Sequence, residues 1–320
     1  MAIFAKGKIE AYCGPPELGA EDDLEAVICD FIKHARKTLD IAVQEIDNEV
    51  IAQAILDASC KGIRVRVFIE QDYLIADSLP RKSKSRSKAA LAAFKKKQWQ
   101  DHSRNKKSNR DILAAMLRCG VDVKADLNPK IFHQKFIIRD YQRGRSLSSK
   151  SAVLTGSTNF TVTGCHKNLN HTVIFNSARI ASIYSDEFNE LVEGTFGAIN
   201  QRKSPNTSTV NLSGVPVRIR FSPDDSPELE VVKQMLKTKR WLYFAIFTFS
   251  GSSGIDDAMI MLRRAGIRIR GVLDSGQGKK AWAATKWLHD KGIDVFLSSH
   301  KKMPGLGKLH HKLMVIDSNI

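Results

Sequence analysis

The sequence predicts an α/β protein made of two duplicated lobes, each with a mostly parallel or mixed sheet flanked by helices. Three observations lead to this prediction. The chain has 320 residues, enough for two domains of ordinary size. Short β-rich runs alternate with segments whose apolar residues recur at helical spacing. The two halves of the chain also resemble each other.

The internal repeat is clearest in two pairs of segments. Residues 39–46 (LDIAVQEI) match residues 242–249 (LYFAIFTF), at a shift of 203. Residues 62–70 (GIRVRVFIE) match residues 266–274 (GIRIRGVLD), at a shift of 204. Each copy is therefore expected to start with the same strand, helix and strand.

Helices are expected between these strands. Apolar residues recur with helical spacing over residues 50–58 and 257–264. Each helix should end before a glycine, Gly62 or Gly266, because glycine readily adopts the left-handed conformation that closes a helix.

The domain boundaries follow from the same comparison. The first repeat covers residues 1–199, and a linker rich in Ser, Asn, Thr and Pro covers residues 200–216. The second repeat covers residues 217–320, and its start, VRIRFSPDD, resembles IEAYCGPPE at residues 9–17.

Residues 74–110 form a basic insertion in the first repeat. They hold twelve Lys or Arg and two Asp, so they carry most of the formal charge of +16. Clustered cations displace counterions from a nucleic-acid backbone, although such a run also suits a solvated surface loop. The side chains that we expect to contact a polyanion are Lys82, Lys84, Arg86, Lys95, Lys96, Lys97, Lys106 and Lys107.

Composition excludes several classes of protein. A hydrophobic content of 42% and a charged content of 26% argue against a disordered, collagen-like or membrane-embedded chain. The longest apolar run, residues 241–249, is too short to cross a bilayer. The five cysteines form no CxxC pair, and the N-terminal residues do not resemble a secretion signal. We therefore expect a cytoplasmic protein without a cofactor, a metal site or a transmembrane segment; its oligomeric state is not predicted.

The same chemical pattern occurs near the end of each copy. The segments FHQKFIIRD and LHHKLMVID share the spacing H-x-K-x4-D, and their apolar, β-branched residues predict buried strands. The candidate catalytic residues are His133, Lys135, Asp140, His310, Lys312 and Asp317. Because side chains alternate across a strand, each histidine shares a face with its lysine, while each aspartate, seven residues from the histidine, should point away.

A second group of polar residues follows the first motif. Ser157 and Asn159, in TGSTNFT, can donate hydrogen bonds to an anionic oxygen. Two imidazoles, two ammonium groups and these donors suit a phosphodiester, and the set contains no ready magnesium cage.

The paired H-x-K-x4-D motifs followed by G-S-x-N resemble the phospholipase D superfamily, in particular its bacterial nuclease-like members. The resemblance extends from about Ile9 to Asp317 and leaves out the basic insertion. It implies a pseudo-twofold pair of lobes with one active site at their interface. It also implies metal-independent cleavage or transfer of a phosphodiester through a covalent phosphohistidine.

The resemblance also implies roles for individual residues. His133 would be the nucleophile and His310 the general acid, although the two roles could be exchanged. The lysines, with Ser157 and Asn159, would stabilise the negative charge of the transition state.

Two departures from the family pattern are visible. The sequence ends at Ile320, before the second copy would reach its own G-S-x-N, so we expect the second lobe to be incomplete by a strand and at least one helix. Where relatives often carry a glutamate that orients a histidine, this chain has Asn170 or His171.

Three functions remain open at this point. The high positive charge favours a nuclease acting on DNA or RNA. A phospholipase or phosphatidyltransferase is the second reading, because a basic surface also binds anionic lipid. A non-catalytic nucleic-acid-binding module is the third.

Overall fold

The structure is a computed structural model that describes residues 1–71, 111–126, 130–144, 149–195, 197 and 209–317. The predicted basic insertion at residues 74–110 lies wholly outside this part of the chain. The same holds for residues 200–208 of the predicted linker.

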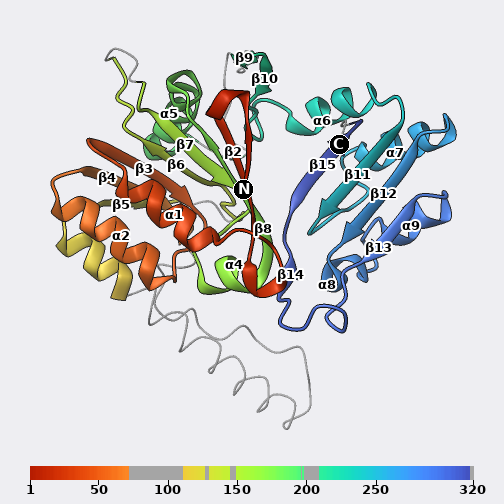
Figure 1. The fold of residues 1–320 in the computed structure, drawn as a ribbon, viewed down its shortest axis with the longest axis horizontal. Helices are drawn as coiled ribbons and strands as arrows, with labels where there is room; N and C mark the ends of the chain where they lie inside the picture. Colours follow the sequence, from red (N-terminus) through yellow and green to blue (C-terminus); the bar gives the residue numbers. More distant parts are fainter. Residues whose placement is uncertain (72–110, 127–129, 145–148, 196, 198–208, 318–320) are drawn as a thin grey trace, which may run out of the picture.

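The first half supplies eight strands of a nine-stranded mixed sheet, in the order β1-β2-β8-β7-β6-β3-β4-β5, and β14 from the second half is the ninth, beside β8 (Figure 1). Its strands are β1 (Ala2–Phe4), β2 (Ile9–Gly14), β3 (Thr38–Val43), β4 (Arg64–Ile69), β5 (Asp122–Ala125), β6 (Lys135–Arg139), β7 (Ala152–Gly156), β8 (Asn168–Phe175) and β14 (Lys308–Leu309). Strands β3, β4 and β5 are parallel, whereas β6 runs antiparallel to β3 and to β7.

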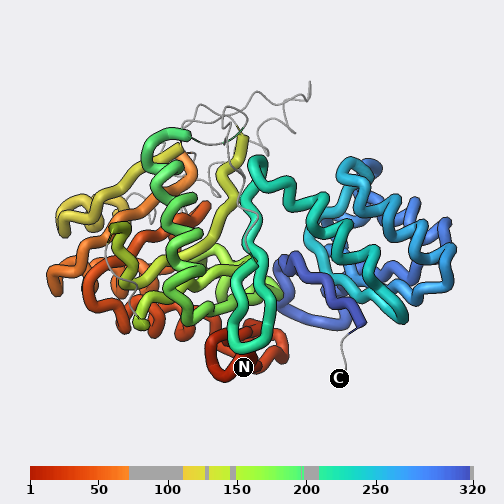
Figure 2. Tube along the Cα trace, turned by 90° about the horizontal axis from the view of Figure 1, so that it is seen from above, coloured from red at the N-terminus to blue at the C-terminus, as the bar shows by residue number. Residues whose placement is uncertain are grey.

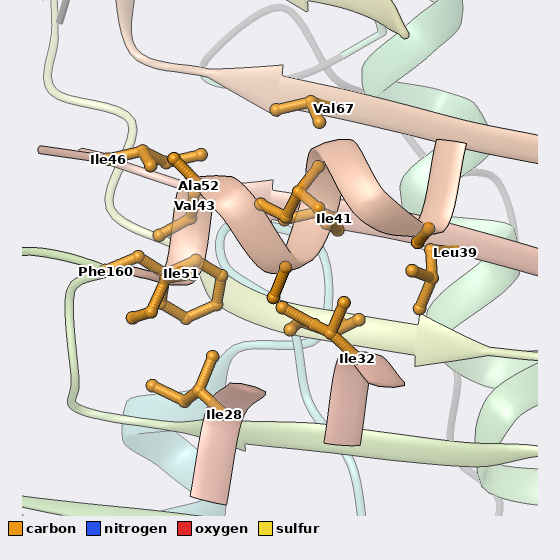
Figure 3. Packing of buried hydrophobic residues seen from close by; sticks show 14 of the residues in the cluster. Ile28, Ile32, Leu39, Ile41, Val43, Ile46, Ile51, Ala52, Val67 and Phe160 are labelled. Atoms are coloured by element: carbon orange, nitrogen blue, oxygen red, sulfur yellow. The ribbon is translucent and has the colours of Figure 1, made fainter. Parts of the chain in front are cut away.

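Helices cover both faces of this sheet. They are α1 (Leu24–Lys33), α2 (Glu49–Cys60), α4 (Val162–His166) and α5 (Ala178–Glu193). Side-chain caps begin them: Asp23 accepts the Ala26 N–H at the start of α1, and Asn48 accepts two N–H groups at the start of α2. Between α1, α2 and the sheet lies a core of branched aliphatic side chains (Figure 3). The cluster under α5 is more aromatic and includes Phe68, Phe136 and Phe188.

The second half builds a smaller sheet with the order β13-β12-β11-β15. Its strands are β11 (Trp241–Ile246), β12 (Arg268–Leu273), β13 (Asp294–Leu297) and β15 (Lys312–Ile316). Helices α6 (Pro227–Met235), α7 (Ile255–Arg264) and α9 (Thr285–Asp290) contribute to its core, and α8 (Ser275–Gly278) follows β12.

The second sheet repeats part of the first. Strands β11, β12 and β13 are parallel and β15 is antiparallel to β11, as β6 is to β3. The order β15-β11-β12-β13 therefore corresponds to β6-β3-β4-β5. The prediction of a mixed α/β fold with helices on its sheets is confirmed, and the shared topology supports the proposed duplication.

The chain between the halves differs from the prediction. Part of the expected linker forms a two-stranded hairpin, β9 (Thr209–Leu212) and β10 (Val215–Arg218). Residues 217–218, which resemble part of β2 in sequence, pair within this hairpin rather than joining the second sheet. In the described residues that sheet has no counterpart of β8, the strand on which β2 pairs.

The two sheets lie side by side along the longest axis of the molecule, with β14 and β15 returning between them (Figures 1 and 2). Strand β14 pairs in parallel with β8, and this pairing brings the second motif against the first half.

Candidate active site

Each motif begins where the chain enters a strand, and a buried carboxylate holds that entry. The Phe132 N–H donates to a side-chain oxygen of Glu70, the residue after β4. The Leu309 N–H donates to Asp274 Oδ2 at 3.0 Å, and Asp274 follows β12. Both carboxylates are 3% exposed, and each fixes the backbone beside a motif histidine.

The two motif histidines face each other. The ring centroids of His133 and His310 are 6.2 Å apart, with an interplanar angle of 67°. His310 is 6% exposed. Two nitrogens that each approach one phosphorus atom to about 3–3.5 Å are about 6–7 Å apart, and the separation of the ring centroids is of this order.

Each motif lysine folds back toward its own histidine. Lys135 Nζ donates to the His133 carbonyl at 2.9 Å and to Gln44 Oε1 at 3.2 Å. Lys312 Nζ lies 2.9 Å from His310 Nε2 and donates to the His310 carbonyl at 3.0 Å. The predicted pairing of each histidine with its lysine is therefore present in both motifs.

Different residues support the two lysines. Phe247 is at the position that corresponds to Gln44, and the centroid of its ring lies 4.9 Å from that of His310. The Lys312 ammonium also lies 5.6 Å from the Phe247 ring centroid. Sequence reasoning missed both Gln44 and Phe247, although each comes directly after one of the two corresponding strands β3 and β11.

Burial and mutual repulsion shift the pKa values of this group. Burial, with Lys135 and Lys312 nearby, lowers the pKa of His133 to about 3. Burial, with the same two lysines nearby, lowers the pKa of His310 to about 2. Burial and adjacent positive charge lower the pKa values of Lys135 and Lys312 to about 7. The site therefore combines neutral imidazoles with ammonium groups that an anion would stabilise.

Asn170, on β8, links the second motif to the first half. Its Oδ1 lies 2.9 Å from His310 Nδ1 and accepts the Ser157 hydroxyl at 2.7 Å. Its Nδ2 donates to the Gly164 carbonyl at 2.8 Å, and the side chain is fully buried. Of the two residues that could replace the glutamate of relatives, Asn170 is the one in contact with a motif histidine.

The two predicted phosphate donors are placed differently from expectation. The Ser157 hydroxyl is buried and donates its hydrogen bond to Asn170 Oδ1, the atom that also contacts His310. Asn159 Nδ2 donates to Gln44 Oε1 at 3.3 Å, and Asn159 Oδ1 is buried without a hydrogen-bond partner among the described residues. Asn159 thus adjoins the group that holds Lys135.

The two motif aspartates lie at the far ends of β6 and β15. Asp140 accepts the backbone N–H groups of Arg36 and Lys37 at 2.9 and 2.7 Å. Asp317 accepts those of Arg240 and Trp241, both at 2.9 Å. The prediction that they point away from the histidines matches this geometry; the structure does not bring them to the other four motif side chains.

A second histidine pair adjoins the site. His171 and His311 stack with centroids 5.4 Å apart, and their Nδ1 atoms are 3.1 Å apart. Burial, with nearby positive charge, lowers both pKa values to about 4. Because His171 is on β8 and His311 lies between β14 and β15, the pair joins the two halves.

Metal-ligand clusters and membrane-spanning helices are both absent from the described residues. Where the structure describes the chain, no three His, Cys, Asp or Glu side chains gather in a way that could hold a metal. Within the same ranges, no helix has the length and apolarity required to span a bilayer. The eight cations predicted to contact a polyanion, between Lys82 and Lys107, lie outside the described residues.

The chain is similar to known proteins. Residues 28–192, just over half of it, match the family described as cardiolipin synthase, PLD-like domain. Over 157 residues, 49% of this chain, the sequence is 23% identical to a phospholipase D of Rickettsia bellii (strain RML369-C). The match spans 58% of that relative, so the chain covers less than two thirds of the relative's length.

Solved structures are also similar. A phosphatidylserine synthase from Haemophilus influenzae Rd KW20 aligns with a TM-score of 0.56 at 13% identity, covering 99% of this chain and 77% of that one. The phospholipase D family member Nuc from Salmonella typhimurium aligns with a TM-score of 0.41 at 18% identity, covering 58% of this chain and 94% of that one. The synthase alignment shows that the fold is shared along nearly the whole chain.

Proposed function

The chain belongs to the family of cardiolipin synthase, PLD-like domains, and on this premise we propose that it is a phosphodiesterase working through a covalent phosphohistidine. The observation that carries the proposal is the facing pair of imidazoles, His133 and His310, 6.2 Å apart and each with its own lysine.

The proposed reaction has two steps. One imidazole attacks phosphorus while the other protonates the departing alcohol, and water then releases the phosphoryl group from the first ring. Proton transfer by a positioned group contributes about 10²- to 10⁴-fold to the rate. Lys135 and Lys312 stabilise the charge on the phosphoryl oxygens, so the reaction needs no metal.

We propose nucleic acid as the substrate, which makes the protein a nuclease. The formal charge of +16 favours a long polyanion, since each neutralised phosphate releases condensed counterions. The cations between residues 74 and 110 would contact the nucleic-acid backbone.

A lipid phosphodiester is the second candidate. The descriptions of the matching family and of the Rickettsia relative both name lipid enzymes. A basic protein also binds anionic bilayers through electrostatic attraction.

The deciding experiment offers labelled single-stranded and duplex oligonucleotides, and phosphatidylcholine vesicles, in excess EDTA. The nuclease proposal predicts oligonucleotide cleavage that persists in EDTA and falls at least 10²-fold in His133→Ala and His310→Ala. His289→Ala is the matched control, because this histidine side chain is 73% exposed on α9 and should leave cleavage unchanged.

Other outcomes identify the alternatives. Choline release from the vesicles with intact oligonucleotides would identify a lipid enzyme. Salt-sensitive oligonucleotide binding without any product would identify a binding module and contradict the enzymatic proposal.

A further inference from the structure

The two motif histidines are held in different ways. His310 Nδ1 lies 2.9 Å from Asn170 Oδ1 and 3.1 Å from the Ser157 carbonyl oxygen. In the part of the chain that the structure describes, no hydrogen bond fixes either ring nitrogen of His133; its ring meets the ring of His310 edge-on. Hydrogen bonds therefore fix the ring of His310, and among the described residues none fixes the ring of His133.

The contacts of His310 define its tautomer. Asn170 Nδ2 donates to the Gly164 carbonyl, which turns Asn170 Oδ1 toward the histidine. Both oxygens around His310 Nδ1 are then acceptors, so this nitrogen carries the proton. In the neutral ring, Nε2 carries the lone pair, which accepts a hydrogen bond from Lys312 Nζ at 2.9 Å.

The chemical nature of Asn170 favours the same protonation state. A carboxylate at this position would pair with an imidazolium and favour the charged ring. An amide provides no such charge, and the titratable groups facing His310 are Lys312, Lys135, Lys308 and His133. These groups disfavour a second proton on His310, so the ring suits attack better than acid catalysis.

We propose that His310 is the nucleophile of this site, acting through Nε2, and that Asn170 is the positioning residue that keeps this nitrogen unprotonated. The inference rests on the proposed function and exchanges the roles that the family resemblance implied. The bound anionic phosphodiester raises the pKa of His133, which then carries a second proton. The Nε2–phosphorus bond forms as the bond from phosphorus to the leaving oxygen breaks, and that oxygen takes this proton from His133, whose ring becomes neutral. Water then attacks phosphorus, its proton passes to His133, and the electron pair of the nitrogen–phosphorus bond returns to Nε2.

An activated substrate separates the two histidines. Thymidine 5′-(p-nitrophenyl phosphate) has a leaving group that departs without protonation, so an enzyme without its general acid still forms the adduct. We expect His133→Ala to give a single-turnover burst of p-nitrophenolate and to accumulate phosphoenzyme. His310→Ala should give neither. A burst in His310→Ala together with none in His133→Ala would overturn the assignment.

Peptide mapping locates the adduct directly. Trypsin releases residues 309–312 and residues 131–135 as separate peptides, which contain His310 and His133 respectively. Because the first peptide also contains His311, the mapping is repeated in His311→Asn, where the label should persist. Turnover with the label on residues 131–135 would refute the assignment alone. A wild-type protein with neither turnover nor adduct would refute the proposed function and the assignment with it.

The role of Asn170 is tested by the pH dependence of kcat/KM in variants at this position. A carboxylate in Asn170→Asp should raise the pKa of His310, so the acidic limb of kcat/KM moves to higher pH and the loss of activity is greatest at the acidic end of the profile. Asn168→Asp is the matched control, because it adds the same charge two residues earlier on the same face of β8. Asn170→Leu should lower activity at every pH without moving the limb. Identical profiles for Asn170→Asp and wild type, with both folded by circular dichroism, would exclude the positioning role.

Discussion

At the scale of single residues, Lys135 is a lysine buried in the site, although burial disfavours its charged form. The residue is 6% exposed, and in the described part of the chain no carboxylate forms an ion pair with its Nζ. Burial lowers its pKa to about 7, well below the ordinary value of 10.5. A buried ammonium of this kind destabilises the folded state unless an anion is bound.

Lys135→Met should therefore remove a destabilisation of the folded state whose size depends on pH. Below pH 7 the lysine is charged in both the folded and unfolded states, so the full cost is present. Between pH 7 and about 10.5 the unfolded chain binds more protons than the folded one, so wild-type stability rises with pH. We expect the free energy of unfolding of Lys135→Met, relative to wild type, to be most favourable at pH 6 and to decline toward pH 10. Urea titrations at several pH values measure this difference, and a constant difference would contradict the prediction.

The residues of the site were predictable to different degrees. The spacing of His133, Lys135, His310 and Lys312 was sufficient to predict two histidine–lysine pairs, because a strand places alternate residues on one face. The contact between Asn170 and His310 depends on a β8–β14 pairing between residues 140 positions apart. No local pattern specifies such a pairing.

At the scale of elements, corresponding acidic residues brace both copies. Asp140 and Asp317 accept N–H groups at the start of β3 and β11, and Glu70 and Asp274 hold the chain ahead of each histidine. Glu70 aligns with Asp274 at the shift of 204, so the repeat contained this information, but the sequence alone did not reveal what the carboxylates bind.

The hydrogen bonds of Asp140 should affect the stability of the fold and not the rate of catalysis. Asp140→Ala loses charge-assisted hydrogen bonds to the amides of Arg36, Lys37 and Thr38, and we expect it to cost about 2–3 kcal/mol. The brace is at the far end of β6 from His133, so kcat should change only a few-fold at a temperature where the variant is folded. Asp140→Asn should cost less, since one acceptor oxygen remains. A large loss of kcat in a fully folded Asp140→Ala protein would restore the direct catalytic role that the sequence motif suggested.

Close packing between β7 and β8 gives another test at this scale. A Cβ on Gly156 would overlap the His171 carbonyl oxygen and press on Thr172, pushing away the strand that carries Asn170. Gly156→Ala should cost about 1–3 kcal/mol and also lower activity. Gly144→Ala is the control, because Gly144 has a positive φ of 79° but open space around it. Equal effects in thermal unfolding would show that backbone conformation, and not the strand contact, accounts for the loss.

At the scale of the whole molecule, the two halves meet through polar and aromatic contacts. The β8–β14 pairing, the Asn170–His310 hydrogen bond and the stacked His171–His311 pair all cross between them. Four histidines lie at or beside this junction and have lowered pKa values: His133, His171, His310 and His311. The environment between the two sheets therefore favours the neutral form of these imidazoles.

This arrangement predicts acid sensitivity of the whole fold. The pKa values of His171 and His311 are about 4 in the folded state against an ordinary 6.5, so below pH 6.5 the unfolded chain takes up protons that the folded chain does not. The stability they provide is present above pH 6.5 and is lost as the pH falls toward 4. Replacing both with phenylalanine keeps a stacked pair but removes its titration, so the double variant should lose less Tm than wild type between pH 7 and pH 5. His289→Phe, which changes an exposed histidine, should retain the wild-type pH dependence. If the double variant and wild type lose the same Tm, acid does not act on the fold through this pair.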